Sequence, residues 1–243
     1  MRRERAFVRV AGPDAEDLLE RLLSNDVAAL AKGETCDALL LTPKARVIAV
    51  VRVHRRGGDE FLLSTEPQLG DVLRTQLVRA RLRSRCEIEP EQHEAWLVLG
   101  GAEVIGTAPS GQEVEAAEWE RFRIDAAIPA WAKEIDDRVL PAEAGLTETH
   151  VSFTKGCYPG QEPVARLHYR GHPNRTLRRL ELDPGELPPT DAELALDGKT
   201  VGRVTSAVRL ADGAIAALGY VRTEVPADAE LQLAVGTAVR QKL

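Results

Sequence analysis

The sequence predicts an α+β protein that ends in a small β-barrel. Helical and strand-like apolar patterns alternate over the first ninety residues, whereas short alternating runs separated by turn residues follow Asn174. No helix of convincing length is indicated in that last part, which favours a barrel. The 243 residues are 44% hydrophobic and 29% charged, which is ordinary for a globular protein with a substantial core.

The N-terminal part is expected to combine a mainly antiparallel sheet with two helices. A first helix opens at Gly12-Pro13-Asp14, because the leucines at 18, 19, 22 and 23 share one of its faces. A second is expected over residues 67–82, where Leu69, Val72, Leu73 and Leu77 recur at helical spacing. Strands are expected at residues 7–10, 36–41, 47–53, 60–64, 85–89 and 94–100, with turns at 42–45 and 54–59.

The chain is less regular between residues 100 and 174. Residues 100–111 are rich in small residues, which suggests a connection, and residues 119–148 have mixed character. Strand-like runs follow at residues 177–182, 201–210, 217–222 and 230–235. Asp197-Gly198 is a strong hairpin signal, and Asp183-Pro184-Gly185 marks a loop.

Composition limits the classes of function. The net charge of −6 argues against a protein that mainly binds polyanions, and 4% aromatic residues are few for stacking on single-stranded nucleic acid. Cys36, Cys86 and Cys157 form no CxxC pair, so neither a metal site nor a disulfide framework is expected. No apolar stretch is long enough for a signal peptide or a membrane span. We therefore expect a soluble, cytoplasmic protein with reduced thiols and no membrane partner.

A basic run interrupts this acidic chain. Its members are Arg74, Arg79, Arg81, Arg83 and Arg85. Such residues most often cover the solvated face of a helix and of the strand after it. Direct nucleic-acid binding is therefore not expected.

The segment KGCYPGQE, residues 155–162, combines a lysine, a thiol and a turn. Pro159-Gly160 suits the central positions of a type II turn. Lys155 can place an ammonium near the Cys157 sulfur, which would favour the reactive thiolate. Spacing alone nevertheless favours a small buried cysteine beside a surface turn. A cysteine-hydrolase triad lacks support, because nothing in the sequence places a histidine near the thiol.

The longer string VSFTKGCYPGQEPVARLHYRG, residues 151–171, closely resembles the signature of the YgfZ-type folate-binding proteins, relatives of the glycine cleavage T-protein. That signature reads lysine-glycine-cysteine-aromatic, any residue, glycine-glutamine-glutamate, and an arginine four residues later. Further segments fall in the family's order: LLSNDV (22–27), LLTPKARVIAVVRV (40–53), RIDAAIP (123–129), LPAEAGL (140–146) and ALGYVR (217–222).

The resemblance implies a ring of two α+β units around a central channel, followed by the barrel. Residues 1–100 would form an N-terminal α+β folate-binding unit, residues 101–173 a second α+β unit that carries the signature, and residues 174–243 the C-terminal β-barrel.

The resemblance also implies a cofactor, tetrahydrofolate or a one-carbon derivative. Asp125 lies where relatives have Arg-x-Glu-Ala-Gly, and its carboxylate would accept the donor pair of the pterin. Its alternative role is that of a capping residue at a helix start. Further cofactor-binding residues implied by the signature are Tyr158, Gly160, Gln161, Glu162 and Arg166. Cys157, with Lys155 beside it, would be a redox-capable thiol rather than a metal ligand or a hydrolase nucleophile.

Departures from the T-protein concern one strand and three glycines. The T-protein strand equivalent to residues 47–53 carries an Asp-Asp pair needed for aminomethyl transfer, and Ala49 and Val50 stand there in this chain. Without a carboxylate, nothing at that place can manage a proton or stabilise an iminium. Ala45, Ala127 and Ala132 replace glycines common in the family, which would narrow the pocket or alter a turn.

Three functions from different classes follow. The preferred one is a tetrahydrofolate-binding accessory protein, because the resembled family is tied to the assembly or repair of iron–sulfur enzymes, including radical enzymes that modify tRNA. Its partners would be reduced folate and iron–sulfur proteins. The alternatives are a folate-dependent one-carbon transferase that uses another base, and a thiol redox or interaction module without folate.

Overall fold

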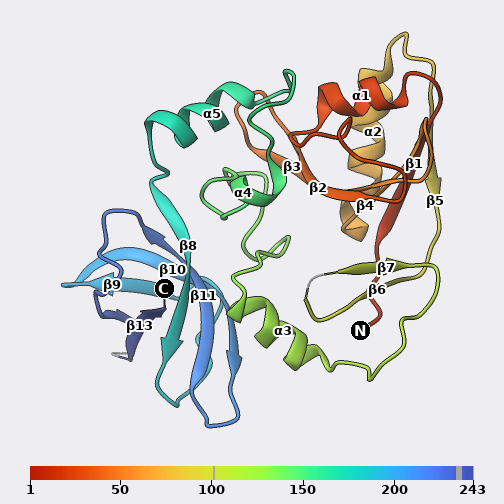
Figure 1. The fold of residues 1–243 in the computed structure, drawn as a ribbon. Coiled ribbons are helices and arrows are strands. Elements are labelled where there is room, and N and C mark those ends of the chain that lie inside the picture. The colour runs from red at the N-terminus through yellow and green to blue at the C-terminus, as the bar shows by residue number, and fades with distance from the viewer. Residues whose placement is uncertain (101, 234–236, 243) are drawn as a thin grey trace.

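The computed structural model describes residues 1–100, 102–233 and 237–242. Figure 1 shows a sheet with its helices on the right, a barrel on the left, and a segment with three short helices and long loops that connects them. This is the predicted α+β architecture with a small C-terminal barrel.

The N-terminal sheet is antiparallel throughout, with strand order β2-β3-β4-β1-β5. Its strands are β1 (Ala6–Ala11), β2 (Thr35–Leu41), β3 (Val47–Arg55), β4 (Glu60–Thr65) and β5 (Glu87–Glu91). Val8 and Val10 pack in the core against α1 (Ala15–Leu22) and α2 (Gly70–Arg81), which follows a 3-10 turn at Pro67–Leu69. Phe7 points to the opposite face, against β6 (Ala95–Leu97). Burial on both faces explains the nearly continuous apolar runs of these strands.

The middle of the chain contains a short ribbon and three helices that long irregular segments connect. β6 pairs with β7 (Glu103–Ile105), and the helices α3 (Ala116–Asp125), α4 (Thr147–His150) and α5 (Gln161–Arg170) follow. The last of these contains the second half of the signature and begins directly after the turn at Pro159-Gly160. Its buried residue, Val164, packs in the neighbouring core.

The barrel closes in the order β10-β11-β8-β13-β12-β9. Its strands are β8 (Arg175–Leu182), β9 (Glu193–Leu196), β10 (Lys199–Arg209), β11 (Ile215–Arg222), β12 (Leu231–Leu233) and β13 (Ala238–Lys242). Asp197 and Gly198 have φ values of 50° and 73°, and Leu196 pairs with Lys199, as in a type I′ hairpin. The Asp-Gly signal is therefore confirmed. The predicted run 230–235 overlaps β12, and its residues 234 and 235 lie outside the described residues.

A buried polar network joins α3 to the barrel. Arg123 donates to Glu134 Oε2 at 2.8 Å and to Ser206 Oγ on β10 at 2.6 Å. Ser206 Oγ in turn donates to Glu134 Oε1 at 2.6 Å, and Tyr220 of β11 donates to the Glu134 carbonyl at 2.8 Å. Because each buried charge has a partner, the network can hold the two parts together without an unpaired ion.

Within the described part of the chain, no helix has the length and apolarity to cross a membrane. No group of three or more His, Cys, Asp or Glu side chains in the same part could hold a metal ion. The predicted unit boundaries at residues 100 and 173 stay predictions, and residue 101 lies outside the description.

Candidate functional site

A central cavity of about 460 Å³ lies between the sheet, the β6–β7 ribbon and the segment from α3 to α4. That volume is in the range of small-molecule sites. Part of the wall is apolar, with Val50, Leu97 and Ile128 among its side chains. The charged residues in its wall are Arg3, Arg5, Asp37, Arg52, Glu66 and Glu103.

Asp37 and Arg52 form a two-pronged ion pair across β2 and β3. Arg52 Nε donates to Asp37 Oδ1 at 2.7 Å, and Arg52 Nη2 donates to Oδ2 at 2.9 Å. Burial raises the pKa of Asp37, but the hydrogen bonds and charge of Arg52 outweigh that effect and lower it overall. Asp37 is therefore a fixed anion at neutral pH and a poor candidate for a general base.

Arg5 and Glu103 bring buried polar atoms to the cavity. Arg5 Nη1 donates to Glu66 Oε1 at 2.8 Å, and Arg5 Nε lies 3.4 Å from Glu103 Oε2. Arg5 Nε and Glu103 Oε1 are buried and make no hydrogen bond within the described residues. Such atoms are costly unless a ligand or water satisfies them, so this wall is suited to a polar ligand.

His150, at the end of α4, is a neutral member of the wall. Burial lowers its pKa below the usual value, despite the raising effect of Asp37. Its Nδ1 lies 2.7 Å from Thr149 Oγ1. At neutral pH the ring is therefore uncharged and can both donate and accept a hydrogen bond.

Lys155 lies completely buried at the end of α1. Its Nζ donates to the carbonyls of Glu20, Leu23 and Asn25 at 2.7–2.8 Å and lies 3.1 Å from Glu20 Oε1. A cation is favourable there because the last carbonyls of a helix carry partial negative charge. The signature lysine thus ties its loop to α1. Its proposed effect on the Cys157 thiol stays a prediction.

Gly160 forms the predicted turn. Its φ and ψ of 84° and 3° are those of the third residue of a type II turn, and Gln161 N donates to Tyr158 O at 3.2 Å. A Cβ at this position would lie 2.6 Å from the carbonyl oxygen of Thr42. Glycine is therefore required both by the backbone angle and by the close approach to the turn between β2 and β3.

The remaining signature residues surround a second cavity of about 380 Å³. Its wall contains Pro43, Tyr158, Gly160, Gln161, Glu162 and Arg166. The structure thus brings five of the predicted cofactor-binding residues together, but not with the residues that line the central cavity. Tyr158 is buried, and its hydroxyl has no hydrogen-bond partner in the described residues.

The cysteines differ in exposure. Cys157 is exposed, so the alternative of a buried packing cysteine is wrong. Cys86 is buried, and burial raises its pKa. Cys36 is half-buried, and burial, with the charge of Asp37, raises its pKa to about 12. Only Cys157 has the accessibility that thiol chemistry requires.

Asp125 is the last residue of α3 rather than the first, so its alternative role as a helix-start cap is wrong. Its side chain is 56% exposed and lies 3.5 Å from Arg121. The neighbouring Ala126 and Ala127 line the central cavity. Its role as the pterin ligand stays a prediction.

Sequence reasoning missed the charged wall of the cavity. Asp37 and Arg52 are charges inside apolar strand patterns, and such positions are the available signal. Arg5 carries no comparable signal, because it lies in a short polar stretch, and Glu103 follows a stretch of small residues that suggests a connection. Their burial depends on contacts between the N-terminus and β7.

Comparison with known proteins shows which proteins have a similar sequence. No protein-family model matches it. It is 36% identical to the tRNA-modifying protein YgfZ of Edwardsiella ictaluri over 49% of this chain and 38% of that protein. It is 27% identical to the mitochondrial iron–sulfur cluster assembly factor IBA57 homolog of Mycosarcoma maydis, over 76% of this chain and 57% of that protein. Both matches span less than two thirds of the relative's length.

The fold has a solved counterpart in the glycine cleavage system aminomethyltransferase T from Bartonella henselae. The TM-score is 0.85 at 18% identity, over 98% of this chain and 83% of that one. These matches confirm the predicted resemblance to the YgfZ-type, T-protein-like proteins.

The structure shows where Ala49 and Val50, which depart from the family pattern, lie. Val50 lines the central cavity, whereas Ala49 packs on the other side of the sheet, in the core under α1 and α2. The cavity wall is therefore apolar at position 50, and Ala49 takes no part in it.

The three alanines at family glycine positions have left-handed backbones. The φ values of Ala45, Ala127 and Ala132 are 58°, 52° and 63°. Glycine tolerates this region at little cost, but alanine does not. These three positions therefore have the backbone angles that glycine tolerates best.

Proposed function

We propose that this chain is a tetrahydrofolate-binding accessory protein that supports the assembly or repair of iron–sulfur enzymes. The relatives named above, a tRNA-modifying protein and an iron–sulfur cluster assembly factor, support the accessory role. We propose that it acts in the cytoplasm, with iron–sulfur proteins as partners.

The observation that carries folate binding is a pair of buried polar atoms in the wall of the central cavity that make no hydrogen bond within the described residues. A pterin presents a donor pair, its amino group and a ring N–H, and a carbonyl acceptor. Glu103 Oε1 can accept from the first, and Arg5 Nε can donate to the second. The residues present therefore fit a reduced folate, which when bound would carry the one-carbon unit.

Asp125 and Glu103 are the two candidate carboxylates for binding the pterin. Asp125 is the choice that the family signature implies, but its side chain is exposed and close to Arg121. Glu103 is buried and has a free oxygen in the described structure. A titration of two variants, Glu103→Gln and Asp125→Ala, distinguishes them.

The test is calorimetric titration with tetrahydrofolate and its 5-formyl derivative. Loss of the pterin carboxylate should weaken binding by about 1.5–3 kcal/mol, the range for a hydrogen bond to a charged group. Glu94→Gln is the matched control, because Glu94 is a surface residue paired with Arg2 beside the same ribbon. Wild-type protein that binds neither folate would overturn the proposed function.

Aminomethyl transfer is not expected. Val50 places two methyl groups where a carboxylate would be needed, and Asp37 is held by Arg52. Methylene-tetrahydrofolate formation from an aminomethylated carrier should not exceed a no-enzyme control. A rate above that control would instead support the one-carbon transferase.

The exposed Cys157 supports the third function, a thiol redox or interaction module. It would be preferred if the thiol reacts rapidly while neither reduced folate binds.

A further inference from the structure

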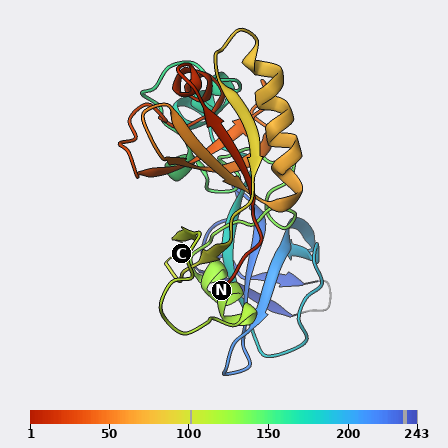
Figure 2. The same cartoon turned by 90° about the vertical axis from the view of Figure 1, so that its right-hand side faces the viewer.

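A third cavity, of about 480 Å³, adjoins the cavity of about 380 Å³ around the signature residues, since Pro43, Pro163 and Arg166 line both. Its wall is formed by the turn between β2 and β3, by α5, and by the segments that precede α4 and β8. Figure 1 shows α5 leading into β8, and Figure 2 shows the sheet-containing half above the barrel. The wall therefore lies where the two halves meet. We call this cavity the basic cavity.

Most charged side chains in the described wall of the basic cavity are cations. They are Lys44, Arg46 and Arg166, and the wall has one carboxylate, that of Glu143, among the described residues. Glu143 is already engaged, because it accepts a hydrogen bond from Arg175 Nη2 at 3.3 Å. The cavity therefore has an excess of positive charge on a chain whose net charge is −6.

None of the three cations has a carboxylate partner among the described residues. Lys44 and Arg166 are exposed, and their side chains make no hydrogen bond to that part of the chain. Arg46 donates to the carbonyl oxygen of Arg138. Glu162 lies one helical turn before Arg166, but no ion pair joins them. Like charges that converge on a cavity repel one another and concentrate anions there.

The backbone that carries these cations is ordered by hydrogen bonds. In the turn between β2 and β3, Thr42 N donates to Arg46 O at 2.9 Å, and Arg46 N donates to Thr42 Oγ1 at 3.0 Å. Gly160 lets the start of α5 approach the same turn closely. The backbone positions of Lys44, Arg46 and Arg166 are therefore fixed by the fold, which reduces the entropy cost of binding an anion.

We propose that the basic cavity binds a compact multivalent oxyanion, a small molecule with at least two phosphate or carboxylate groups. Guanidinium groups bind both kinds of group through paired N–H donors, and a lysine ammonium adds three further donors. A volume of about 480 Å³ is suited to a small molecule. The described part of the wall contains no Phe, Tyr or Trp side chain, so stacking of nucleic-acid bases is not favoured.

This proposal goes beyond folate binding and does not depend on it. The basic cavity and the central cavity share no described wall residue.

The test is calorimetric titration of the full chain with inorganic pyrophosphate and, separately, with citrate, at low ionic strength in a buffer free of other phosphates and carboxylates. We expect at least one of the two anions to bind, and its binding to weaken as sodium chloride is added, because salt screens charges in an open cavity. Lys44→Gln/Arg166→Gln removes two of the three cations and should lower the affinity at least about tenfold. Both side chains are exposed, so this change leaves the core intact.

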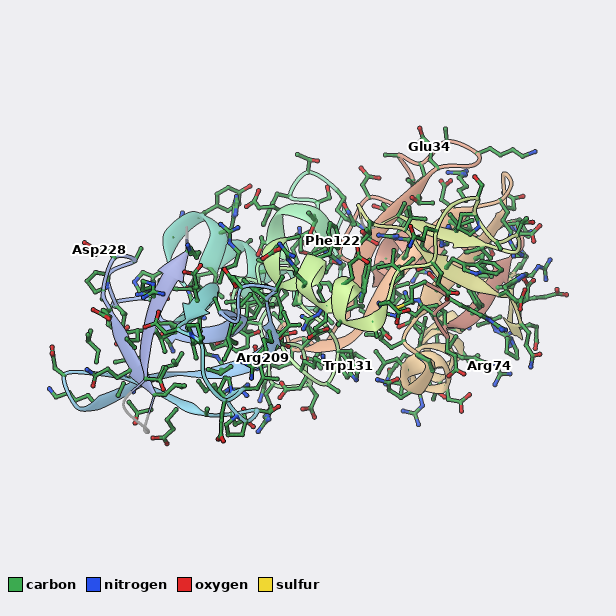
Figure 3. The ribbon with its side chains drawn as sticks, turned by 90° about the horizontal axis from the view of Figure 1, so that it is seen from below. Glu34, Arg74, Phe122, Trp131, Arg209 and Asp228 are labelled. Atoms are coloured by element: carbon green, nitrogen blue, oxygen red, sulfur yellow. The ribbon has the colours of Figure 1, made fainter. Side chains whose placement is uncertain are left out.

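The matched control is Lys32→Gln/Arg209→Gln, which removes one lysine and one arginine at exposed positions without an ion pair in the described structure. Lys32 precedes β2 and Arg209 ends β10, each at the strand end that lies away from the basic cavity. Figure 3 labels Arg209 and, two residues after Lys32, Glu34, in the two halves of the molecule. The control should bind as tightly as wild type, and far-UV circular dichroism checks that both variants are folded.

Binding of pyrophosphate alone would support the proposal with phosphate as the recognised group, and binding of citrate alone would support it with carboxylate. Absence of binding of both anions, an unchanged affinity in Lys44→Gln/Arg166→Gln, or an equal loss in the control would overturn it. A single-stranded RNA that binds more tightly than either anion, and is lost in the same cavity variant, would overturn it in favour of a nucleic-acid surface.

Discussion

Ala45, Ala127 and Ala132 show how a single methyl group can conflict with the backbone conformation of its own residue. Ala132 is the clearest case, because it is exposed and its methyl has no core to fill. A left-handed alanine costs about 1–2 kcal/mol, and glycine relieves that strain while it raises the entropy of the unfolded chain by up to about 1 kcal/mol.

We expect Ala132→Gly to raise the free energy of unfolding by up to about 1 kcal/mol. Urea denaturation measures it, with Ala117→Gly as the control. Ala117 is also exposed, but it lies inside α3, where glycine should cost about 0.5–1 kcal/mol. Equal destabilisation by both changes would contradict the assigned backbone at 132.

The relative reactivity of the three cysteine thiols is a second prediction at the residue scale. Cys157 should label with iodoacetamide faster than Cys36 and Cys86, whose pKa values are raised by burial, to about 12 for Cys36. Peptide mass mapping over a range of pH resolves the three sites. Labelling of Cys157 no faster than that of the other two would contradict a reactive thiol at this exposed position.

A Lys155 variant tests whether the lysine charge activates the Cys157 thiol. If its charge favours the thiolate, Lys155→Met should slow Cys157 labelling near neutral pH while the protein is still folded. The buried contacts of Lys155 with α1 predict a second effect, a large loss of stability, because Glu20 and three carbonyls would lose their cation. Circular dichroism on the labelled sample separates the two.

At the scale of elements, the signature works as a connector. Gly160 places the start of α5 against the turn between β2 and β3, and Lys155 ties the same loop to α1. The signature therefore joins elements separated by more than a hundred residues.

Gly160→Ala should destabilise the protein by more than about 1–2 kcal/mol. The added methyl faces both the cost of a positive φ and a 2.6 Å approach to the Thr42 carbonyl. Gly33→Ala is the matched control, since Gly33 also has a positive φ, of 89°, but open space around it. Thermal unfolding should show the larger shift for Gly160→Ala. Similar shifts would mean that the close approach contributes nothing.

At the scale of the molecule, attachment of the barrel depends on the network around Glu134. Arg123→Met would leave the Glu134 carboxylate buried with Ser206 and a backbone N–H but without its cation. Breaking a buried pair in this way costs about 3–5 kcal/mol. Denaturant unfolding, followed by Trp fluorescence and by far-UV circular dichroism, should show that loss. A stability within about 0.5 kcal/mol of wild type would show that the network is dispensable.

Much of this protein follows from local sequence. Alternation and helical spacing predicted the sheet, α1, α2 and the barrel, and Asp197-Gly198 predicted its hairpin, because each pattern acts over a few neighbouring residues. The signature predicted the family and the turn at Gly160 in the same way.

The composition of the central cavity depended instead on contacts between distant segments. Arg5 meets Glu103 across almost a hundred residues, Lys155 reaches α1, and Asp125 emerges at the exposed end of a helix that spacing did not reveal. No local pattern encodes such meetings, since they depend on how the sheet, the ribbon and the middle segment pack together. The tertiary structure therefore decides whether a charged residue faces a cavity, a helix end or water. The chemistry of the site depends on this placement.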